Sequence, residues 1–361
     1  MNKHHLFAIA GLFAFPALAA LGLGFTFSND ALPGRLQTRN TDPFQPAHRF
    51  ERIADDIYMA AATGAVNVGS NTVVIVNERD VMIVDSHITP ASARALVEDI
   101  KSITDKPIRY VVNTHYHFDH AHGNQIFGPE VQVIGHEFTR AKLSGDVMSE
   151  KTYISFNGGI PAQLEQQRAQ LAAETEPERR AQLESRLKYN EAHWAALQEV
   201  KPTPPNVTLR DRMTLYLGGR EIQLIHPGRA HTGGDVIVYL PAERIICTGD
   251  AMTAGTAYMG DGFIDEWDET LETIVTLDFE TVLPGHGAPF QGKERLGQFR
   301  DYLRELWKQA AALKAEGVSA ADAAPRIDLS ANPLARRGGA PEVAVARIYE
   351  LIDSSADVRL P

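Results

Sequence analysis

The segment Thr114-His115-Tyr116-His117-Phe118-Asp119-His120 places three imidazoles and a carboxylate at the spacing H-x-H-x-D-H. It directly follows residues 108–113, a β-branched and aromatic run that is typical of a buried strand. Alternate side chains of an extended segment point the same way, so His115, His117 and Asp119 are expected to face one side. Imidazole nitrogens and carboxylate oxygens are the donors that zinc and similar cations favour. The segment therefore predicts a metal site where a strand runs out into a loop.

The composition is that of an ordinary globular protein. The chain has 361 residues, 44% hydrophobic and 22% charged, which is enough for one large domain or two modest ones. The net charge of −11 argues against nucleic acid as a partner, because that partner requires clustered Lys and Arg. A small-molecule substrate is expected instead, and an anionic one is not excluded, because a metal centre supplies local positive charge. The composition does not predict an oligomeric state.

The N-terminus is expected to direct export. Within residues 1–25, Lys3 precedes an apolar run, and Pro16-Ala17-Leu18-Ala19 resembles a signal-peptidase site. An uncleaved membrane anchor is the alternative, because about 20 apolar residues can span a bilayer. Both interpretations predict a periplasmic or secreted protein, with residues 26–49 as a linker arm. Cys247 is the only cysteine, so no disulfide can form within the chain.

The pattern beyond residue 50 predicts sheets covered by helices. Hairpins are expected at 71–85, 213–225 and 236–248, and a helix from Thr89-Pro90 to about residue 102. Residues of about 160–203 are predicted to form a helical insertion that breaks at 175–177 and packs on the domain, with a dimerisation element as the alternative. Residues 291–361 are predicted to be a helical C-terminal extension.

Three later motifs add metal-binding side chains. Ala230-His231-Thr232-Gly233-Gly234-Asp235, Gly249-Asp250 and Gly285-His286-Gly287 each follow a predicted strand or hairpin. The adjacent glycines allow the backbone to turn sharply and to approach a metal closely. Each motif alone is weak evidence, because a Gly-Asp pair is usually a turn and a single histidine is usually structural. Their joint appearance at strand ends is what favours one shared site.

With these motifs, residues 50–290 resemble the metallo-β-lactamase superfamily. The resemblance implies an α/β (α+β) fold, an αββα sandwich with two metals in a groove at the strand ends. It implies that the first metal is bound by His115, His117 and His231, and the second by Asp119, His120 and His286, with Asp250 bridging them. Asp85 matches the acidic residue that closes an early strand in this superfamily. His226 lacks the motif context and is expected either to support the ligands from outside or to be structural.

The ligand set resembles one branch of that superfamily. Asp250 stands where one lactamase subclass has a zinc-binding cysteine, and another subclass has the Asp119-His120 pair without the bridging acid. A chain that has both the Asp119-His120 pair and the bridging Asp250 resembles thioesterases of the glyoxalase II type, lactonases and alkyl sulfatases. Cys247 lies three residues before Asp250 and is expected to be a small buried hydrophobe.

The expected activity is that of an exported hydrolase with two Zn²⁺, iron and manganese being alternatives. A metal-bound hydroxide would cleave an ester, lactone, thioester or amide bond, including a β-lactam, and Asp119 would orient or deprotonate the metal-bound water. An iron-dependent persulfide dioxygenase, a sulfatase or phosphodiester hydrolase, and a non-enzymatic zinc-binding module stay open.

The loop at 257–264 is predicted to contact substrate through Tyr258 and Met259, because it follows Asp250 and contains glycine. The alternative for this loop is an ordinary connection to a helix at 266–277. Tyr116 and Phe118 are expected to pack beneath the ligands.

Overall fold

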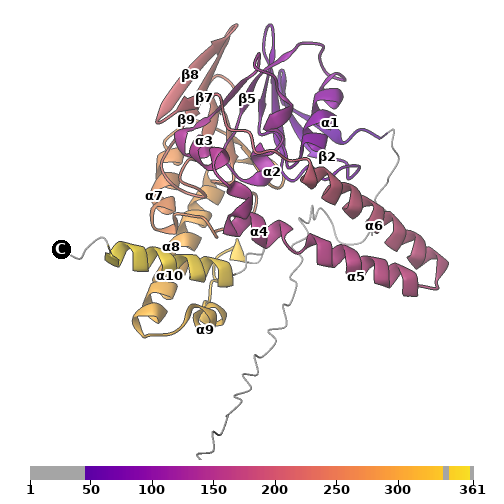
Figure 1. The fold of residues 1–361 in the computed structure, drawn as a ribbon. Helices are drawn as coiled ribbons and strands as arrows, with labels where there is room; N and C mark the ends of the chain where they lie inside the picture. Colours follow the sequence, from indigo (N-terminus) through magenta and orange to yellow (C-terminus); the bar gives the residue numbers. More distant parts are fainter. Residues whose placement is uncertain (1–44, 336–340, 358–361) are drawn as a thin grey trace, which may run out of the picture. The chain divides into compact units, whose positions relative to one another are not determined.

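The computed structural model describes residues 45–335 and 341–357 (Figure 1). The predicted signal peptide and most of the predicted linker arm lie outside these residues. Within the described part of the chain, no helix combines the length and the apolar character needed to cross a membrane.

The described strands form two sheets. The first sheet has the order β1-β2-β3-β4-β5-β6-β7, and β4 to β7 run parallel to one another. Its strands are β1 (His48–Ala54), β2 (Ile57–Ala62), β3 (Thr72–Val76), β4 (Val81–Val84), β5 (Ile108–Val112), β6 (Gln132–His136) and β7 (Val207–Leu209).

The second sheet has the order β13-β12-β11-β10-β9-β8 and is antiparallel except between β11 and β12. Its strands are β8 (Arg212–Leu217), β9 (Arg220–Ile225), β10 (Ile237–Leu240), β11 (Ile245–Gly249), β12 (Thr281–Pro284) and β13 (Phe290–Gln291). The hairpins predicted from the polar turns are confirmed: β3 pairs with β4, β8 with β9 and β10 with β11.

Helices follow or connect these strands. They are α1 (Pro90–Ile100), α2 (Phe118–Ala121), α3 (Glu137–Ser144), α4 (Lys151–Asn157), α5 (Ile160–Ala173), α6 (Pro177–Gln198), α7 (Ile264–Val275), α8 (Glu294–Ala315), α9 (Ala320–Ala323), α10 (Pro341–Asp357) and the short 3₁₀ turns η1 (Asn124–Ile126), η2 (Val147–Ser149) and η3 (Ala324–Arg326). As predicted, α1 begins with Pro90 in its first turn, and Thr89 caps it by accepting from the Ser92 amide.

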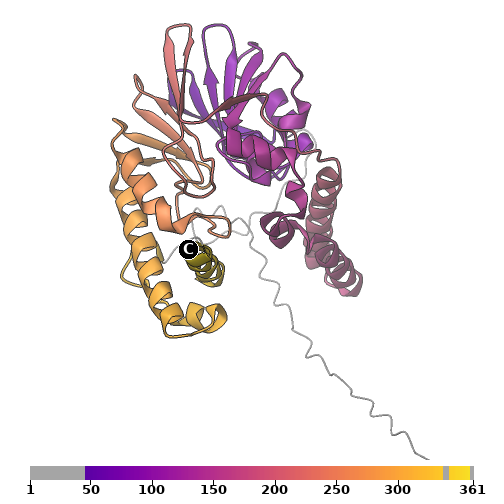
Figure 2. The same ribbon diagram turned by 60° about the vertical axis from the view of Figure 1, so that its left-hand side comes forward.

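Three apolar layers hold the sheets and helices together. Val73, Met82 and Val112 of the first sheet pack against Leu224 and Val238 of the second, which forms the core between the sheets. The outer face of the first sheet is covered by α1, and the outer face of the second by α7, α8 and α10 (Figures 1 and 2). The predicted αββα arrangement of a mixed α/β fold is confirmed.

The helical additions lie on this framework in two ways. The predicted hairpin at 160–203 is present as α5 and α6, with the break where Thr175-Glu176-Pro177 predicts it. Leu164, Leu187 and Leu197 are its buried side chains. Helices α8, α9 and α10 share one apolar core with the second sheet, so these helices pack directly on the domain. The predicted domain boundaries themselves stay predictions.

Candidate metal centre

Strand ends position the predicted ligands. The H-x-H-x-D-H segment follows β5, His231 lies between β9 and β10, Asp250 directly follows β11, and His286 follows β12. The parallel register pairs Gly249 of β11 with Pro284 of β12, which brings the residues that follow these strands together. A Cβ at position 285 would collide with Asp250 Oδ1, so glycine there allows the two loops to approach this closely.

The predicted alternation of the opening segment is correct only for its first half. His115 and His117 lie in the irregular stretch after β5, whereas Asp119 and His120 belong to the short helix α2. The expectation that Asp119 continues an extended segment is therefore wrong. The change of backbone conformation at His117 directs Asp119 and His120 to a second group of donors.

We define the first triad as His115, His117 and His231. Each offers a ring nitrogen within 4.8 Å of the others, and all three residues are buried. His117 Nδ1 lies 2.8 Å from His231 Nε2. The ring of His115 stands almost perpendicular to the other two, at 83° and 89°. Three imidazoles that converge in this way suit a borderline divalent cation.

We define the second triad as Asp119, His120 and His286. Their donor atoms also lie within 4.8 Å of one another. Asp119 Oδ2 is 3.0 Å from His286 Nε2 and 3.5 Å from His120 Nε2, and the two imidazole nitrogens are 3.3 Å apart. His286 is the most accessible of the three, with its side chain 22% exposed. His286 is therefore more accessible than any member of the first triad, all of which are buried.

Asp250 lies between the two triads. Its Oδ2 atom is 3.7 Å from His231 Nε2 of the first triad and 3.3 Å from His286 Nε2 of the second. Its Oδ1 atom is 3.6 Å from His120 Nε2. All seven predicted ligands are thus brought into one cluster, with the carboxylate of Asp250 between the two triads.

The buried donors fit divalent metal ions. Among the described residues, His115 Nε2 and Asp250 Oδ1 are buried side-chain atoms without a hydrogen bond. Such atoms normally have a partner, because leaving them unsatisfied costs about 1–3 kcal/mol each. A cation between the triads would satisfy both atoms.

In three of the histidines, the ring nitrogen that faces away from the centre already has a hydrogen-bond partner. His115 Nδ1 lies 3.0 Å from Thr114 Oγ1, His120 Nδ1 lies 2.8 Å from Asp85 Oδ2, and His231 Nδ1 lies 2.9 Å from the Tyr258 carbonyl oxygen. Such outer partners are the usual support of metal-binding histidines.

Asp85 supports the second triad from the core. It follows β4 with a left-handed φ of 68°, which non-glycine residues rarely adopt. Its carboxylate accepts hydrogen bonds from the Thr114 amide and hydroxyl, each at 2.8 Å, besides facing His120. Burial raises the pKa of Asp85, and the charge of His120 opposes that shift. The match of Asp85 to the acidic residue at the end of an early strand thus has a physical basis.

The two triads differ in electrostatics. Burial and the neighbouring imidazoles lower the pKa of His115 well below its ordinary value, and burial lowers that of His231 to about 3. Burial has the same tendency at His120, but Asp119, Asp250 and Asp85 outweigh it and raise the pKa to about 9. Burial opposes the charge of Asp119 as well, yet His120 and His286 bring its pKa to about 2. Without metal, these shifts make His115 and His231 neutral and the second triad a charged cluster.

The loop before α7 contacts the first triad. The Tyr258 ring lies 6.5 Å from that of His117, and its hydroxyl lies 3.3 Å from Thr152 Oγ1 of α4. Tyr258 therefore stands beside the centre, where the sequence places a substrate contact. Met259 is 4% exposed and packs in the core of the second sheet and its helices, so we assign it a packing role in place of the predicted substrate contact.

Asp261 of the same loop was not predicted. Its Oδ2 atom is 3.0 Å from His117 Nε2 and accepts a hydrogen bond from the Tyr116 hydroxyl at 3.0 Å. In the sequence it stands between two glycines, a pattern that indicates only a turn. Its position 144 residues after His117 gives no local signal of their contact.

Three other expectations concern neighbouring residues. Tyr116 and Phe118 are buried, as expected for side chains that pack beneath the ligands. His226 faces the Asp235 carbonyl oxygen, and its ring lies against that of His136 at an interplanar angle of 35°, which fits a structural role. Cys247 is 1% exposed in the core between the sheets, and it belongs to no group of donors among the described residues.

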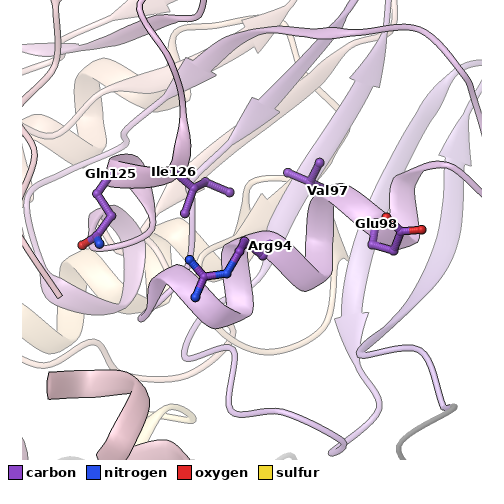
Figure 3. A pocket seen from close by; sticks show the side chains of 5 residues that line it. All are labelled: Arg94, Val97, Glu98, Gln125 and Ile126. Carbon is purple, nitrogen blue, oxygen red and sulfur yellow. The ribbon is translucent and has the colours of Figure 1, made fainter. Parts of the chain in front are cut away.

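Two hollows lie near the centre and on the surface. A cavity of about 10 Å³ beside His117 is lined by Tyr116, Phe118 and residues of α4, and is about large enough for one water. The larger surface pocket between α1 and η1 is lined by Arg94, Val97, Glu98, Gln125 and Ile126 (Figure 3). No triad member is among them, and Arg94 is paired with Glu199 at 3.0 Å. We therefore locate the candidate site by its metal-binding side chains and not by this pocket.

Comparison with known proteins places this arrangement in a family. Residues 65–286 match the model of the metallo-beta-lactamase superfamily, and the chain belongs to that superfamily. Its members, including alkylsulfatases and metallo-β-lactamases, are metal-dependent hydrolases.

Individual relatives are distant. A linear primary-alkylsulfatase from Pseudomonas sp. is 25% identical over 62% of this chain and 42% of its own length. The 2,4-dinitroanisole O-demethylase subunit alpha from Nocardioides sp. is 24% identical over 69% of this chain and 60% of its own length. The chain therefore spans about half the length of these curated relatives. A metallo-beta-lactamase structure from Pontibacter korlensis has a TM-score of 0.50 at 16% identity, covering 71% of this chain and 99% of that one, and indicates a shared fold.

Proposed function

We propose that this protein is an exported hydrolase with two zinc ions that cleaves an ester, lactone, thioester or amide bond of a small molecule. The observation that carries the proposal is the position of Asp250, within 3.3–3.7 Å of ring nitrogens from both triads. A carboxylate placed there can bridge two cations. Export rests on the sequence of residues 1–25 alone.

The residues present suit such a reaction. Zinc held by the triads would lower the pKa of a coordinated water and polarise the bond under attack. His115, His117 and His231 would hold the first ion, and Asp119, His120 and His286 the second. Asp119 Oδ2 faces the centre beside His286 Nε2 and would orient the attacking water or accept its proton.

The nature of the substrate bond has a second candidate. The alkylsulfatase relative favours a sulfate ester, because that relative is named for this reaction. Sulfate and carboxylate esters both place negative charge on oxygen as the bond breaks, and a cationic centre stabilises either charge.

A panel of chromogenic substrates on metal-quantified, full-length protein tests the proposal. We expect turnover of at least one carboxylate ester, thioester, lactone, lactam or sulfate ester, loss of that turnover with EDTA, and recovery on addition of zinc. Two zinc ions per chain are expected. Protein that binds two zinc ions and turns over none of the panel would contradict the hydrolase.

The same preparation separates the iron-dependent alternative. One iron per chain, together with oxygen consumption on a persulfide, would replace the hydrolase by a dioxygenase. The His117→Ala variant is the matched control for any activity observed, because it removes one donor of the first triad.

A further inference from the structure

We infer that Asp261 is a positioning residue for the first triad: its carboxylate fixes the ring orientation and the tautomer of His117. The inference rests on the proposed metal centre, but it holds for any reaction performed there. It goes beyond that proposal because it gives the loop before α7 a defined role in metal affinity.

The geometry of His117 leads to this assignment. His117 Nδ1 points toward His231, and its Nε2 lies 3.0 Å from Asp261 Oδ2. The same Oδ2 atom accepts a hydrogen bond from the Tyr116 hydroxyl, so it is an acceptor and Nε2 of His117 must carry the proton. The lone pair is then left on Nδ1, the nitrogen that faces the donors of the triad.

Asp261 is itself held in place. Its Oδ2 atom accepts from the Tyr116 hydroxyl at 3.0 Å, and its side chain is 23% exposed. Burial works against the charge of Asp261, but hydrogen bonds from His117, Thr152 and Tyr116 bring its pKa below the usual range. These contacts keep the carboxylate beside Nε2 of His117.

The same loop holds a second member of the triad. His231 Nδ1 lies 2.9 Å from the carbonyl oxygen of Tyr258, three residues before Asp261. A carbonyl oxygen accepts only, so Nδ1 of His231 carries the proton and Nε2 faces the site. One segment, residues 258–261, thus sets the tautomers of two of the three histidines.

A purely structural role for Asp261 makes a different prediction. If the residue only ties its loop to Tyr116, loss of the tyrosine hydroxyl should have the same effect as loss of the carboxylate. If Asp261 positions His117, the two changes should differ in their effect on zinc affinity. Tyr116→Phe keeps the contact between the Asp261 carboxylate and His117, whereas Asp261→Ala removes that contact.

The test uses full-length protein and Zn²⁺ alone, titrated against a chromophoric chelator. We expect Asp261→Ala to weaken one of the two zinc sites by about 10- to 100-fold. Asp261→Asn keeps an acceptor oxygen and should recover part of that loss. Tyr116→Phe removes one hydrogen bond to Asp261 but leaves the carboxylate beside His117, so it should weaken zinc binding by less than Asp261→Ala does. Asp265→Asn, which changes an exposed carboxylate at the start of α7, should bind zinc like the unchanged protein. Equal affinity in Asp261→Ala and the unchanged protein would overturn the inference, as would an equal loss in Tyr116→Phe.

A second readout does not depend on metal. Nitrogen NMR of ¹⁵N-histidine-labelled, metal-free protein reports which ring nitrogen of His117 carries the proton. We expect Nε2–H in the unchanged protein and a mixture of tautomers in Asp261→Ala, with thermal melting as the check that the variant is folded. Protein that binds no zinc would contradict the proposed function, whereas an unchanged tautomer in Asp261→Ala would contradict this inference.

Discussion

The two triads share Asp250 but are built on different supports. The first consists of three imidazoles, two of them with a lowered pKa, and the loop at 258–261 contacts it from outside. The second combines a carboxylate with two imidazoles whose pKa is raised, and Asp85 holds it from the buried end of β4. The first triad therefore offers mainly neutral nitrogens to a metal. The second must release protons before it can bind one.

The largest effect is expected where the triads meet. Asp250→Ala removes the carboxylate between them, and we expect activity to fall by more than about 100-fold, beyond the range typical of an outer partner. Zinc content should fall from two ions per chain as well. Activity assays with metal quantification check this. Full activity of Asp250→Ala with two bound ions would contradict the role of Asp250 as a ligand shared by the two sites.

Asp85→Asn tests the support of the second triad. The amide cannot accept at both positions from His120 and Thr114, so we expect zinc affinity at the second triad to fall by about 10- to 100-fold. The first triad should keep its affinity, which is the reverse of the result expected for Asp261→Ala. The zinc titration against a chromophoric chelator, described above for the Asp261 variants, measures the affinity of both sites. An equal loss at both sites would mean that the supports are not separate.

The pH dependence of zinc binding should also differ between the triads. The folded pKa of His120, about 9, exceeds its ordinary value of 6.5. Its ion pairs therefore stabilise the metal-free protein fully below about pH 6.5 and are lost as the pH rises through about 9. Zinc must displace that proton, and also the proton of His286, whose pKa is raised as well. Affinity at the second triad should therefore rise by at least about tenfold per pH unit between these values.

His286→Ala and His117→Ala isolate the two sites for this measurement. In His286→Ala, the remaining first triad should show a shallow dependence on pH, because burial keeps His115 and His231 neutral. In His117→Ala, the zinc affinity of the remaining second triad should depend steeply on pH. Equal slopes would contradict the electrostatic difference.

Cys247→Ala should have the smallest effect. The thiol is buried in the core between the sheets, and burial raises its pKa, so it is not a thiolate at neutral pH. We expect a loss of about 1 kcal/mol in the free energy of unfolding from the small cavity, with zinc content unchanged. Chemical denaturation and metal quantification check this, and a lost zinc ion would make Cys247 a ligand.

The sequence predicted the hairpins of the sheets because strand periodicity is local, and it predicted the seven donors because their motifs resemble those of the superfamily. Asp250 and His286 could be placed at strand ends without knowledge of the tertiary structure. The conformation of Asp119 was mispredicted because the alternation was extended past His117, after which α2 begins.

The supports of the triads were harder to predict. Asp261 contacts His117 across 144 positions, and no local pattern marks such a pair. Met259 and Tyr258 are neighbours in one loop, yet one enters the core and the other faces the centre. That division depends on the packing of α7 and α4, which periodicity does not give.

The most direct test of the account is a crystal structure of zinc-loaded protein with an anomalous-difference map recorded at the zinc absorption edge. The account predicts two peaks, one within each triad, with Asp250 in contact with both. A single peak, or two peaks without Asp250 between them, would contradict it.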